Sequence, residues 1–519
     1  MKQFYALSFF VLLFLFTACD KKEKSEVAAW PYGVKYEVFV RSFADGNGDG
    51  KGDLKGLTSK LDYLQDLGVN GIWLMPIMNS PTYHKYDVTD YKSIDPEYGT
   101  VEEFKKFVEE AHSRNIKVVI DLILNHTGSD HPWFQSAVKG KDSPYRDYYV
   151  WAKKDSIRQQ MSKKTTSFDS DNITQWHAVN GDTLAEHFYG FFWSGMPDLN
   201  FDNPKVREEF TDIGKFWLND LNVDGFRLDA AKHIYPDDRA EDNHAFWIEF
   251  RKEMEKIKPN VYLVGEVWSS AKVVAPYLKG LPALFNFDMG YAITNVVNAG
   301  KDTIGLISKY KEISDFYKTV TSEYLDATFL RNHDQNRISS ELGDNPAKAR
   351  IAAGILLTLP GTPYIYYGEE IGMLGTKPDE FIREPFIWDV DKKDAMQTTW
   401  EVPKFSTTST VTPLSKQKGD DHSMYQFYKK LIHYRNGSKA LTQGEIENSD
   451  LNISEVVSFI RKSGEEEVLV LNNVSDFEVT VKIGGGNAKF DAIDYDSDGT
   501  AKLQDGALVL PAYSTVILK

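Results

Sequence analysis

Short apolar runs alternate with amphipathic stretches along most of the chain from Trp30 onward. The amphipathic stretches repeat apolar residues three and four positions apart, which is typical of helices that pack one face on a core. Such helices are predicted at residues 101–114, 205–218, 245–257 and 347–357. The apolar runs are predicted strands, at residues 36–40, 71–74, 117–122, 225–229, 261–266, 282–287, 326–330 and 364–367. Eight strands that each precede a helix predict an α/β protein with a parallel (β/α)8 TIM barrel.

Two regions depart from this alternation. Residues 127–196, after the third strand, are too long and too polar for an ordinary connection, and they predict an inserted, lid-like subdomain. Beyond an expected helix near residues 424–435 the chain changes to short strand-like runs, such as 468–471 and 477–483, which predict a C-terminal antiparallel β-sandwich. The expected divisions are the barrel at 30–126 and 197–440, the insertion at 127–196, and the C-terminal domain at 441–519.

The N-terminus predicts export. Lys2 precedes an apolar run of about fifteen residues, shorter than the roughly 20 that span a membrane, so residues 1–18 are typical of a signal peptide. The residues before Cys19, the only cysteine, resemble the lipobox of bacterial lipoproteins. We therefore expect a lipid anchor at Cys19, a tether over residues 19–29, and a place in the bacterial cell envelope at the outer membrane. A soluble secreted protein cleaved nearby is the alternative.

Composition excludes some functions. The 519 residues include 60 basic and 76 acidic side chains, a net charge of −16. Such a charge repels phosphate backbones, so nucleic acid is not an expected partner. Aromatic residues make up 13% of the chain, which suits stacking on sugar rings but equally suits a large core.

Charged side chains follow several of the predicted strands at their carboxyl ends. In parallel barrels these ends form one rim, where the chemistry of such enzymes is carried out. A single carboxylate there is more often a helix cap or part of a structural ion pair, but this many at matching strand ends indicate an active site. The residues that should meet at this rim are Asp229, Glu266, Asp334, His126, His333 and Arg227.

These residues lie in four segments, 121–126, 225–233, 265–268 and 329–337, that resemble the signature segments of the α-amylase family of glycoside hydrolases. A fifth segment, 196–200, is similar to the form in a subgroup intermediate between oligo-1,6-glucosidases and neopullulanases. The resemblance extends from about Trp30 to the end of the chain. It implies that Asp229 is the nucleophile, Glu266 the general acid/base, and Asp334 the carboxylate that holds the distorted sugar.

Physical reasoning agrees with these roles. A retaining glycosidase needs two carboxyl groups about 5 Å apart, one charged and one protonated. Arg227 lies two residues before Asp229 on the same strand, so both side chains should point into the barrel mouth and Arg227 should keep Asp229 ionised. Glu266, near Trp268 and other carboxylates, should retain its proton.

The resemblance also implies a substrate-binding set. Tyr86 resembles the sugar-stacking tyrosine of the family, although a loop aromatic that caps the barrel is the alternative. The family more often has Gly where this chain has Lys85, which leaves the shape of this loop open. The residues expected to bind substrate are Tyr86, His84, His126, Arg227, Lys232, His233, His333 and Arg337.

A loop after the first strand alternates oxygen-bearing side chains with glycines. Such spacing can converge on one hard cation, although the loop lacks the Glu and the preceding helix of an EF-hand. Family resemblance implies Ca²⁺, and a solvated turn is the alternative. The expected ligands are Asp45, Asn47, Asp49, Asp53 and the carbonyl of Lys51. Asn125 resembles a ligand of a second calcium in many amylases, with Asp169 or Asp171 as candidate partners.

The expected activity is retaining endo-hydrolysis of α-1,4-glucosidic bonds in starch and maltooligosaccharides, in an open cleft. Trp176 and the aromatic segment 188–193 would stack on the glucan or, alternatively, pack the insertion on the barrel. A 4-α-glucanotransferase and a neopullulanase-like or α-glucosidase activity remain open alternatives. A non-catalytic starch-binding lipoprotein is the alternative of another class. Other outer-membrane glucan-uptake proteins are candidate partners.

Overall fold

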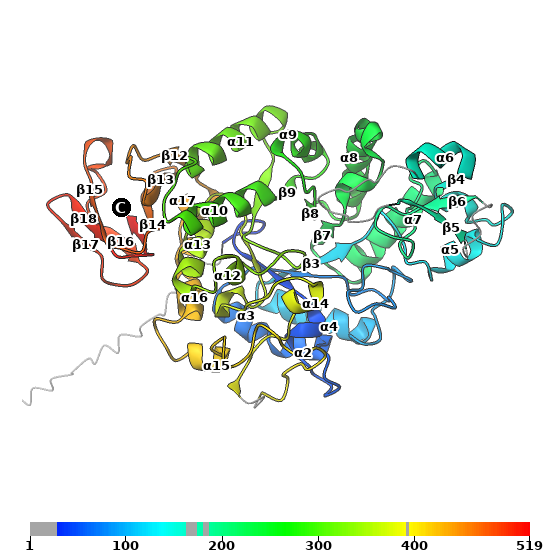
Figure 1. Ribbon diagram of the computed structural model, residues 1–519, viewed down its shortest axis with the longest axis horizontal. Coiled ribbons are helices and arrows are strands. Elements are labelled where there is room, and N and C mark those ends of the chain that lie inside the picture. The colour runs from blue at the N-terminus through cyan, green and yellow to red at the C-terminus, as the bar shows by residue number, and fades with distance from the viewer. Residues whose placement is uncertain (1–27, 162–173, 180–185, 391–393) are drawn as a thin grey trace, which may run out of the picture.

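The computed structural model describes residues 28–161, 174–179, 186–390 and 394–519 (Figure 1). The expected signal peptide, Cys19, and the candidate calcium ligands Asp169 and Asp171 lie outside the described residues. No helix within the described ranges is long and apolar enough to cross a membrane.

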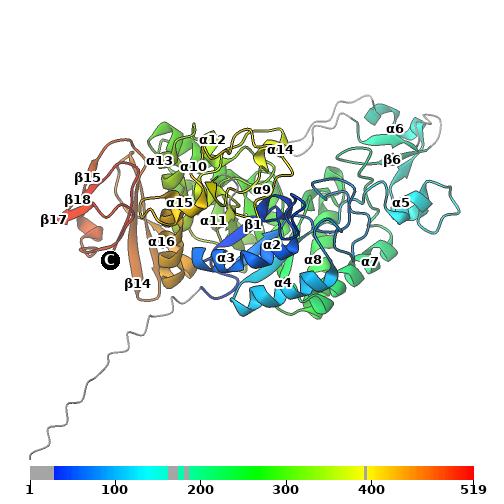
Figure 2. The ribbon, with the colours of Figure 1, turned by 90° about the horizontal axis from the view of Figure 1, so that it is seen from below.

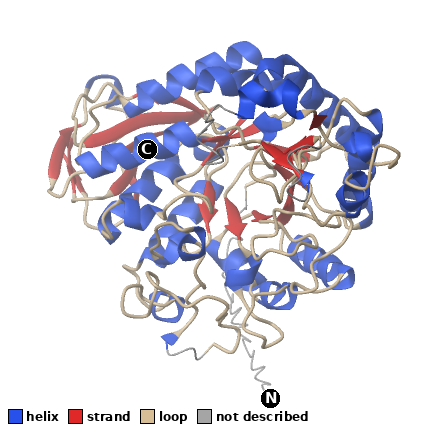
Figure 3. Cartoon of the chain, turned by 45° about the vertical axis from the view of Figure 1, so that its right-hand side comes forward, coloured by secondary structure: helices blue, strands red, loops and turns tan. Residues whose placement is uncertain are grey.

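Eight parallel strands form the central sheet, which confirms the predicted barrel. Their spatial order is β10-β9-β8-β7-β3-β2-β1-β11, and a parallel bridge from Phe329 to Tyr364 joins the two ends of the sheet. Figure 3 shows these strands at the centre of the molecule with helices outside them. The strands are β1 (Lys35–Val38), β2 (Gly71–Leu74), β3 (Lys117–Leu122), β7 (Gly225–Leu228), β8 (Tyr262–Gly265), β9 (Ala283–Asn286), β10 (Leu325–Thr328) and β11 (Tyr364–Tyr366).

Helices connect successive strands on the outside of the barrel. Several begin with strong capping sequences: Asn203 and Asn345 each accept a backbone hydrogen bond and are followed by Pro, and Thr100 forms a capping box with Glu103. The principal helices are α2 (Leu54–Ser59), α3 (Leu61–Leu67), α4 (Val101–Ser113), α7 (Pro204–Lys215), α8 (Ala240–Ile257), α9 (Ala271–Val274), α10 (Phe287–Ala299), α11 (Leu306–Val320), α13 (Pro346–Thr358) and α16 (Met424–Gly437).

Side chains alternate between the inside and the outside of the barrel. On β2, Ile72 and Leu74 pack in the large core under the helices, whereas Trp73 packs inside the barrel with Phe285 and Tyr364. Because the interior is filled, substrate can reach polar groups only at an end of the barrel.

The inserted segment after β3 contains a small antiparallel sheet in the order β4-β6-β5. Its elements are α5 (Pro132–Ala137), β4 (Trp151–Ala152), α6 (Lys154–Met161), β5 (Trp176–Ala178) and β6 (His187–Tyr189). In Figures 1 and 2 this subdomain lies at the opposite end of the molecule from the C-terminal domain.

The C-terminal domain consists of two antiparallel sheets, ordered β12-β13-β14-β19-β16 and β15-β18-β17. Apolar residues from both sheets, including Leu469, Val481 and Leu508, form a separate core between them, as expected of a sandwich. The helix α17 (Lys439–Gln443) leads into strands β12 (Glu445–Asn448), β13 (Val456–Ser463), β14 (Glu466–Asn473), β15 (Val479–Lys482), β16 (Ile493–Asp496), β17 (Lys502–Gln504), β18 (Ala507–Leu510) and β19 (Thr515–Leu518).

Candidate active site

Four of the six polar residues predicted at strand ends line a pocket of about 610 Å³ at the carboxyl end of the barrel: His126, Asp229, Glu266 and Asp334. Asp229 and Glu266 each stand one residue beyond a strand, β7 and β8, and Asp334 lies in the loop after β10. The residues that line the pocket are His84, Tyr86, His126, Phe192, Trp193, Met196, Asp229, Ala230, Glu266, Trp268, Asp334, Lys377, Asp379 and Arg383.

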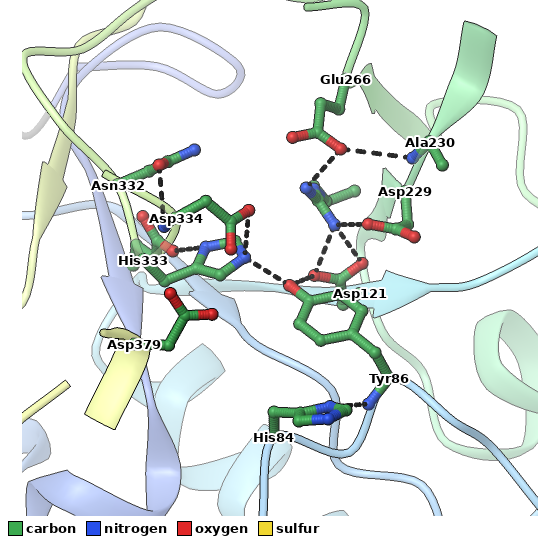
Figure 4. Close-up of polar contacts among 12 residues, drawn as sticks. His84, Tyr86, Asp121, Asp229, Ala230, Glu266, Asn332, His333, Asp334 and Asp379 are labelled. Atoms are coloured by element: carbon green, nitrogen blue, oxygen red, sulfur yellow. Dashed lines mark hydrogen bonds and ion pairs between the residues drawn. The ribbon is translucent and has the colours of Figure 1, made fainter. Parts of the chain in front are cut away.

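The buried guanidinium of Arg227 contacts three carboxyl groups, those of Asp121, Asp229 and Glu266, which are labelled in Figure 4. Its Nη1 donates to both carboxyl oxygens of Asp121, at 2.9 and 3.0 Å, and to Oδ1 of Asp229 at 2.6 Å. Its Nη2 lies 2.9 Å from Oε2 of Glu266. The contact with Asp229 follows from the two-residue spacing, which places both side chains on one face of the strand.

One cation cannot neutralise three carboxylates, so the pKa values in this cluster shift. Desolvation, reinforced by the charges of Asp229 and Asp334, raises the pKa of Glu266 to about 8. Desolvation and the charge of Asp229 also raise the pKa of the fully buried Asp121 to about 7. Glu266 therefore carries a proton at neutral pH, the protonation state that was expected from its surroundings in the sequence.

Asp334 has the opposite electrostatic environment. Oδ2 of Asp334 lies 3.0 Å from Nε2 of His333, and Oδ1 lies 3.0 Å from Nη2 of Arg383. Burial opposes ionisation, but these two cations hold the pKa of Asp334 well below its usual range. Asp334 is thus a charged hydrogen-bond acceptor in the pocket wall.

His333 is itself fixed from two sides. Its Nδ1 lies 2.5 Å from Oε1 of Glu37 on β1, and its Nε2 lies 2.6 Å from the hydroxyl of Tyr86. Although burial opposes protonation, the carboxylates of Asp334 and Glu37 raise the pKa of His333 to about 10. The imidazole is therefore a cation that joins β1 to the loop after β10.

Tyr86 and His84 enter the pocket from the loop after β2. The Tyr86 ring stacks on His333 with a centroid distance of 5.6 Å, and its hydroxyl donates to Asp121 at 3.1 Å. The backbone N–H of Tyr86 donates to Nδ1 of His84 at 3.2 Å. Lys85, which left the shape of this loop open, adopts a left-handed conformation with its side chain buried.

His126 offers an unused polar atom to a ligand. Its Nδ1 lies 3.1 Å from Oδ1 of Asn125, whereas Nε2 is buried and has no hydrogen-bond partner among the described residues. A buried nitrogen without a partner is costly, and His126 is one of the residues that line the pocket.

Five residues expected to bind substrate are absent from the pocket lining: Arg227 and His333, described above, and Lys232, His233 and Arg337. Arg337 is buried, and its Nη1 donates to the carbonyl of Tyr367 at 2.7 Å, so it holds the loop after β11. The ring of His233 stacks on Phe191 at 3.9 Å. Nζ of Lys232 lies 3.6 Å from Asp237, close to the protein surface.

The aromatic segment of the insertion divides between two roles. Phe188 is buried and packs edge-on against Phe134 and Trp151, and the Trp176 ring packs on Tyr189. Phe192 and Trp193 line the pocket instead, and Trp193 is 48% exposed. Of the aromatic residues in segment 188–193, only these two therefore face the pocket.

Three pocket residues were not anticipated from the sequence. Lys377, Asp379 and Arg383 come from the segment after β11. Helix α14 (Asp379–Ile382) begins at Asp379 and ends one residue before Arg383, and the side chains of Asp379 and Arg383 lie 3.0 Å apart. Alternating charges of this kind are usual on exposed loops, so the sequence held no signal that they line this pocket.

The predicted calcium loop folds around its own backbone amides. Oδ1 of Asp45 accepts from Gly48 N at 2.6 Å, and Oδ2 of Asp53 accepts from Gly46 N at 3.1 Å. All predicted donors are oxygens, the ligand type that Ca²⁺ prefers, so the donor chemistry fits this ion. Within the described residues no group of three or more His, Cys, Asp or Glu side chains is arranged to hold a metal ion.

Asn125 contacts an acid that sequence reasoning did not single out. Its Nδ2 donates to the carbonyl of His233 at 2.6 Å and to Oδ2 of Asp198 at 3.3 Å. Desolvation raises the pKa of Asp198 to about 7. These contacts tie the end of β3 to the segment that leaves the insertion.

A β/α barrel whose rim holds a protonated carboxyl group beside a second carboxyl paired with Arg has the features of a barrel glycosidase. The sequence matches the model of the α-amylase catalytic domain over residues 37–444 and that of the α-amylase SusG C-terminal domain over residues 456–517. The chain therefore belongs to the α-amylase family, and it is a glycoside hydrolase of the amylase type.

Individual relatives agree with this assignment. The chain is 44% identical to α-amylase 3 of Dictyoglomus thermophilum, with 93% of this chain and 92% of the relative covered. It is 37% identical to a 4-α-glucanotransferase of Thermotoga neapolitana, with 80% and 89% covered. The crystal structure of an α-amylase from H. orenii superposes with a TM-score of 0.86 at 44% identity, covering 94% of this chain and 99% of that one.

Replacing Glu266 by Gln should stabilise the protein increasingly as pH rises. A carboxyl group whose folded-state pKa is about 8 binds its proton more tightly when folded, so its contribution to stability is complete below the unfolded pKa and is lost as pH rises toward 8. Gln does not titrate. The free energy of unfolding of Glu266→Gln relative to wild type should therefore grow between pH 5 and pH 8, by at most about 1.4 kcal/mol per pH unit.

Urea unfolding at several pH values measures this difference. Glu109→Gln, on the exposed face of α4, is the matched control and should show no such trend. A constant difference for Glu266→Gln across the same pH range would contradict the raised pKa.

Proposed function

We propose that the enzyme hydrolyses internal α-1,4-glucosidic bonds of starch and maltooligosaccharides with retention of anomeric configuration. The proposal rests on two carboxyl groups that line the same pocket: Glu266, which is protonated, and Asp229, which accepts a hydrogen bond from Arg227. The α-amylases among its relatives support the choice of substrate.

In this mechanism Asp229 is the nucleophile. Its carboxylate attacks the anomeric carbon while Glu266 gives its proton to the glycosidic oxygen, which breaks the bond and leaves a covalent glycosyl–enzyme intermediate. Glu266, now ionised, then takes a proton from water as that water attacks the same carbon and releases Asp229. The raised pKa of Glu266 favours recovery of the proton for the next cycle.

Asp334 and His126 are proposed to hold the sugar that reacts. The charged Asp334 accepts hydrogen bonds from ring hydroxyls, and these strengthen as positive charge develops on the flattening ring. Nε2 of His126 bonds a further hydroxyl. Tyr86 supplies an aromatic face in the same pocket.

Internal cleavage is supported by the exposed wall of the pocket. Trp193 stands at the edge of the insertion with about half of its surface exposed, so a glucan chain can stack on it while continuing beyond the pocket. A 4-α-glucanotransferase activity is the second candidate, favoured by the relative from Thermotoga neapolitana. It differs only in that a sugar hydroxyl, rather than water, resolves the intermediate.

The decisive experiment follows the iodine colour of amylose against reducing ends released. An endo-hydrolase should abolish the colour when few bonds have been cut, and Asp229→Asn or Glu266→Gln should lower kcat by at least about a thousandfold, equivalent to roughly 4 kcal/mol in the barrier. A colour that fades only in proportion to released glucose or maltose would refute internal cleavage. Disproportionation of maltotriose without a net gain of reducing ends would favour the transferase.

We further propose that the loop formed by Asp45, Asn47, Asp49, Lys51 and Asp53 binds Ca²⁺, with Asn125 as a candidate ligand of a second ion. An ion that binds only the folded chain stabilises it by mass action. EGTA should therefore lower the melting temperature of wild type, and Asp49→Ala should remove most of this response. If elemental analysis finds no calcium and EGTA leaves the melting curve unchanged, the loop is a solvated turn.

Finally, we propose that Cys19 carries a lipid that anchors the enzyme in the bacterial outer membrane, beside other glucan-uptake proteins. The support is the N-terminal sequence alone. Labelled fatty acid should enter the wild-type protein in a bacterial host and should be absent from Cys19→Ser. Equal labelling of both proteins would exclude an anchor at this residue.

A further inference from the structure

A buried lysine separates the two pocket residues of the loop after β2. Lys85 has a φ of 65°, in the left-handed region that glycine adopts more readily than any residue with a side chain. The residue as a whole is nevertheless only 2% exposed. Position 85, between His84 and Tyr86, thus combines an unfavourable backbone conformation with a buried charge. Other interactions must offset the free-energy cost of both.

The compensation comes from two carboxylates on the segment that follows. Nζ of Lys85 lies 2.9 Å from Oδ2 of Asp95 and 3.0 Å from Oε2 of Glu97, and it also donates to the carbonyl of Ser80 at 3.2 Å. The side chains of Lys85 and Asp95 are each 3% exposed. A buried ion pair of this kind is strongly unfavourable to break, because one charge would remain buried and unpaired.

The segment that receives Lys85 is itself held in place. Glu97 also accepts from Nη1 of Arg41 at 2.6 Å and from Nζ of Lys51, both in the region after β1. Oδ2 of Asp95 accepts from the backbone N–H of Ser80 at 3.1 Å. The ion pairs therefore connect the loops that follow β1 and β2.

The far side of the loop is fixed by close backbone packing. Gly128 N donates to the carbonyl of Val88 at 2.8 Å, and a Cβ at Gly128 would lie 2.6 Å from the carbonyl oxygen of Asp87. One side of the loop is thus fixed by the ion pairs of Lys85, and the other side is fixed by the backbone contacts with Gly128. Between these two attachments Tyr86 reaches Asp121 and His333 (Figure 4).

We propose that Lys85 is a positioning residue for sugar binding. Its ion pairs with Asp95 and Glu97 fix the backbone on either side of it, and thereby set where His84 and Tyr86 meet the sugar that reacts. This inference rests on the proposed glucan hydrolysis, since it assigns how one wall of that site is held in place.

The test compares two variants that separate the backbone from the charge. Lys85→Gly relieves the left-handed strain but removes the ion pairs, and Lys85→Met keeps an unbranched side chain, one atom shorter, without its charge. Both should lower kcat/KM for maltoheptaose at least tenfold, mainly through kcat, because contacts to the sugar matter most as its ring flattens. Both should also weaken binding of acarbose, an inhibitor with a flattened ring, by a similar factor.

A purely structural role for Lys85 gives a different result. In that case Lys85→Gly, which suits the local φ, would match wild type in kcat/KM and acarbose affinity well below its melting temperature, and this outcome would overturn the proposal. Adding Asp95→Asn to Lys85→Met removes the unpaired carboxylate and keeps the test valid if the single variant does not fold. The double variant should retain the tenfold loss.

Lys92→Met is the matched control. Lys92 belongs to the same stretch of chain, but its ion pair with Asp212 is exposed to solvent. This variant should stay within twofold of wild type, and a tenfold loss here would show that the effect does not depend on position. If wild type itself fails to cleave maltoheptaose, the proposed function fails; if wild type cleaves and the Lys85 variants equal it, only the positioning role fails.

Discussion

The active site depends on one buried cation. Arg227 contacts Asp121, Asp229 and Glu266 at once, with almost no exposure to solvent. A buried guanidinium requires negative partners, and its partners cannot all be ionised around a single positive charge. Because the carboxyl groups outnumber the one positive charge, some are protonated while others are ionised. Acid/base chemistry at neutral pH requires such a difference. The planar fork of Arg also holds three groups from three neighbouring strands in fixed geometry.

A second polar network surrounds this centre and orients the pocket wall. His333 joins Glu37, Asp334 and Tyr86, so groups from β1, from the loop after β2 and from the loop after β10 share one imidazole. Outside it, the buried pair of Lys85 and Asp95 holds the loop that carries Tyr86. The cluster around Arg227 and the network around His333 meet at the hydroxyl of Tyr86, which contacts both Asp121 and His333. Charged groups from several loops therefore fix the side chains that line the pocket at the end of the barrel.

The sequence was informative where regular structure and local spacing determine position. All eight strands were predicted within a few residues of their observed bounds, because buried parallel strands and amphipathic helices have distinct periods. The contact between Arg227 and Asp229 followed from their two-residue separation. Prediction was weaker in the loops: Arg337 proved to be buried away from the pocket, and Phe188 packs within the insertion. Loop side chains are placed by tertiary contacts, and spacing along the chain carries little information about them.

The sequence by itself determined the barrel, its two additional domains, and the group of carboxylates at one rim, since these depend on hydrophobic period and on which strand each acid follows. Only the tertiary structure decided how the charges are distributed. Arg383 reaches Asp334 across 49 residues of sequence, and Glu37 reaches His333 across 296. Desolvation at Glu266 and Asp121 likewise exists only once the barrel has closed around them. The pKa of a buried group depends on every charge within a few ångströms in space, and that neighbourhood is defined by folding rather than by order along the chain.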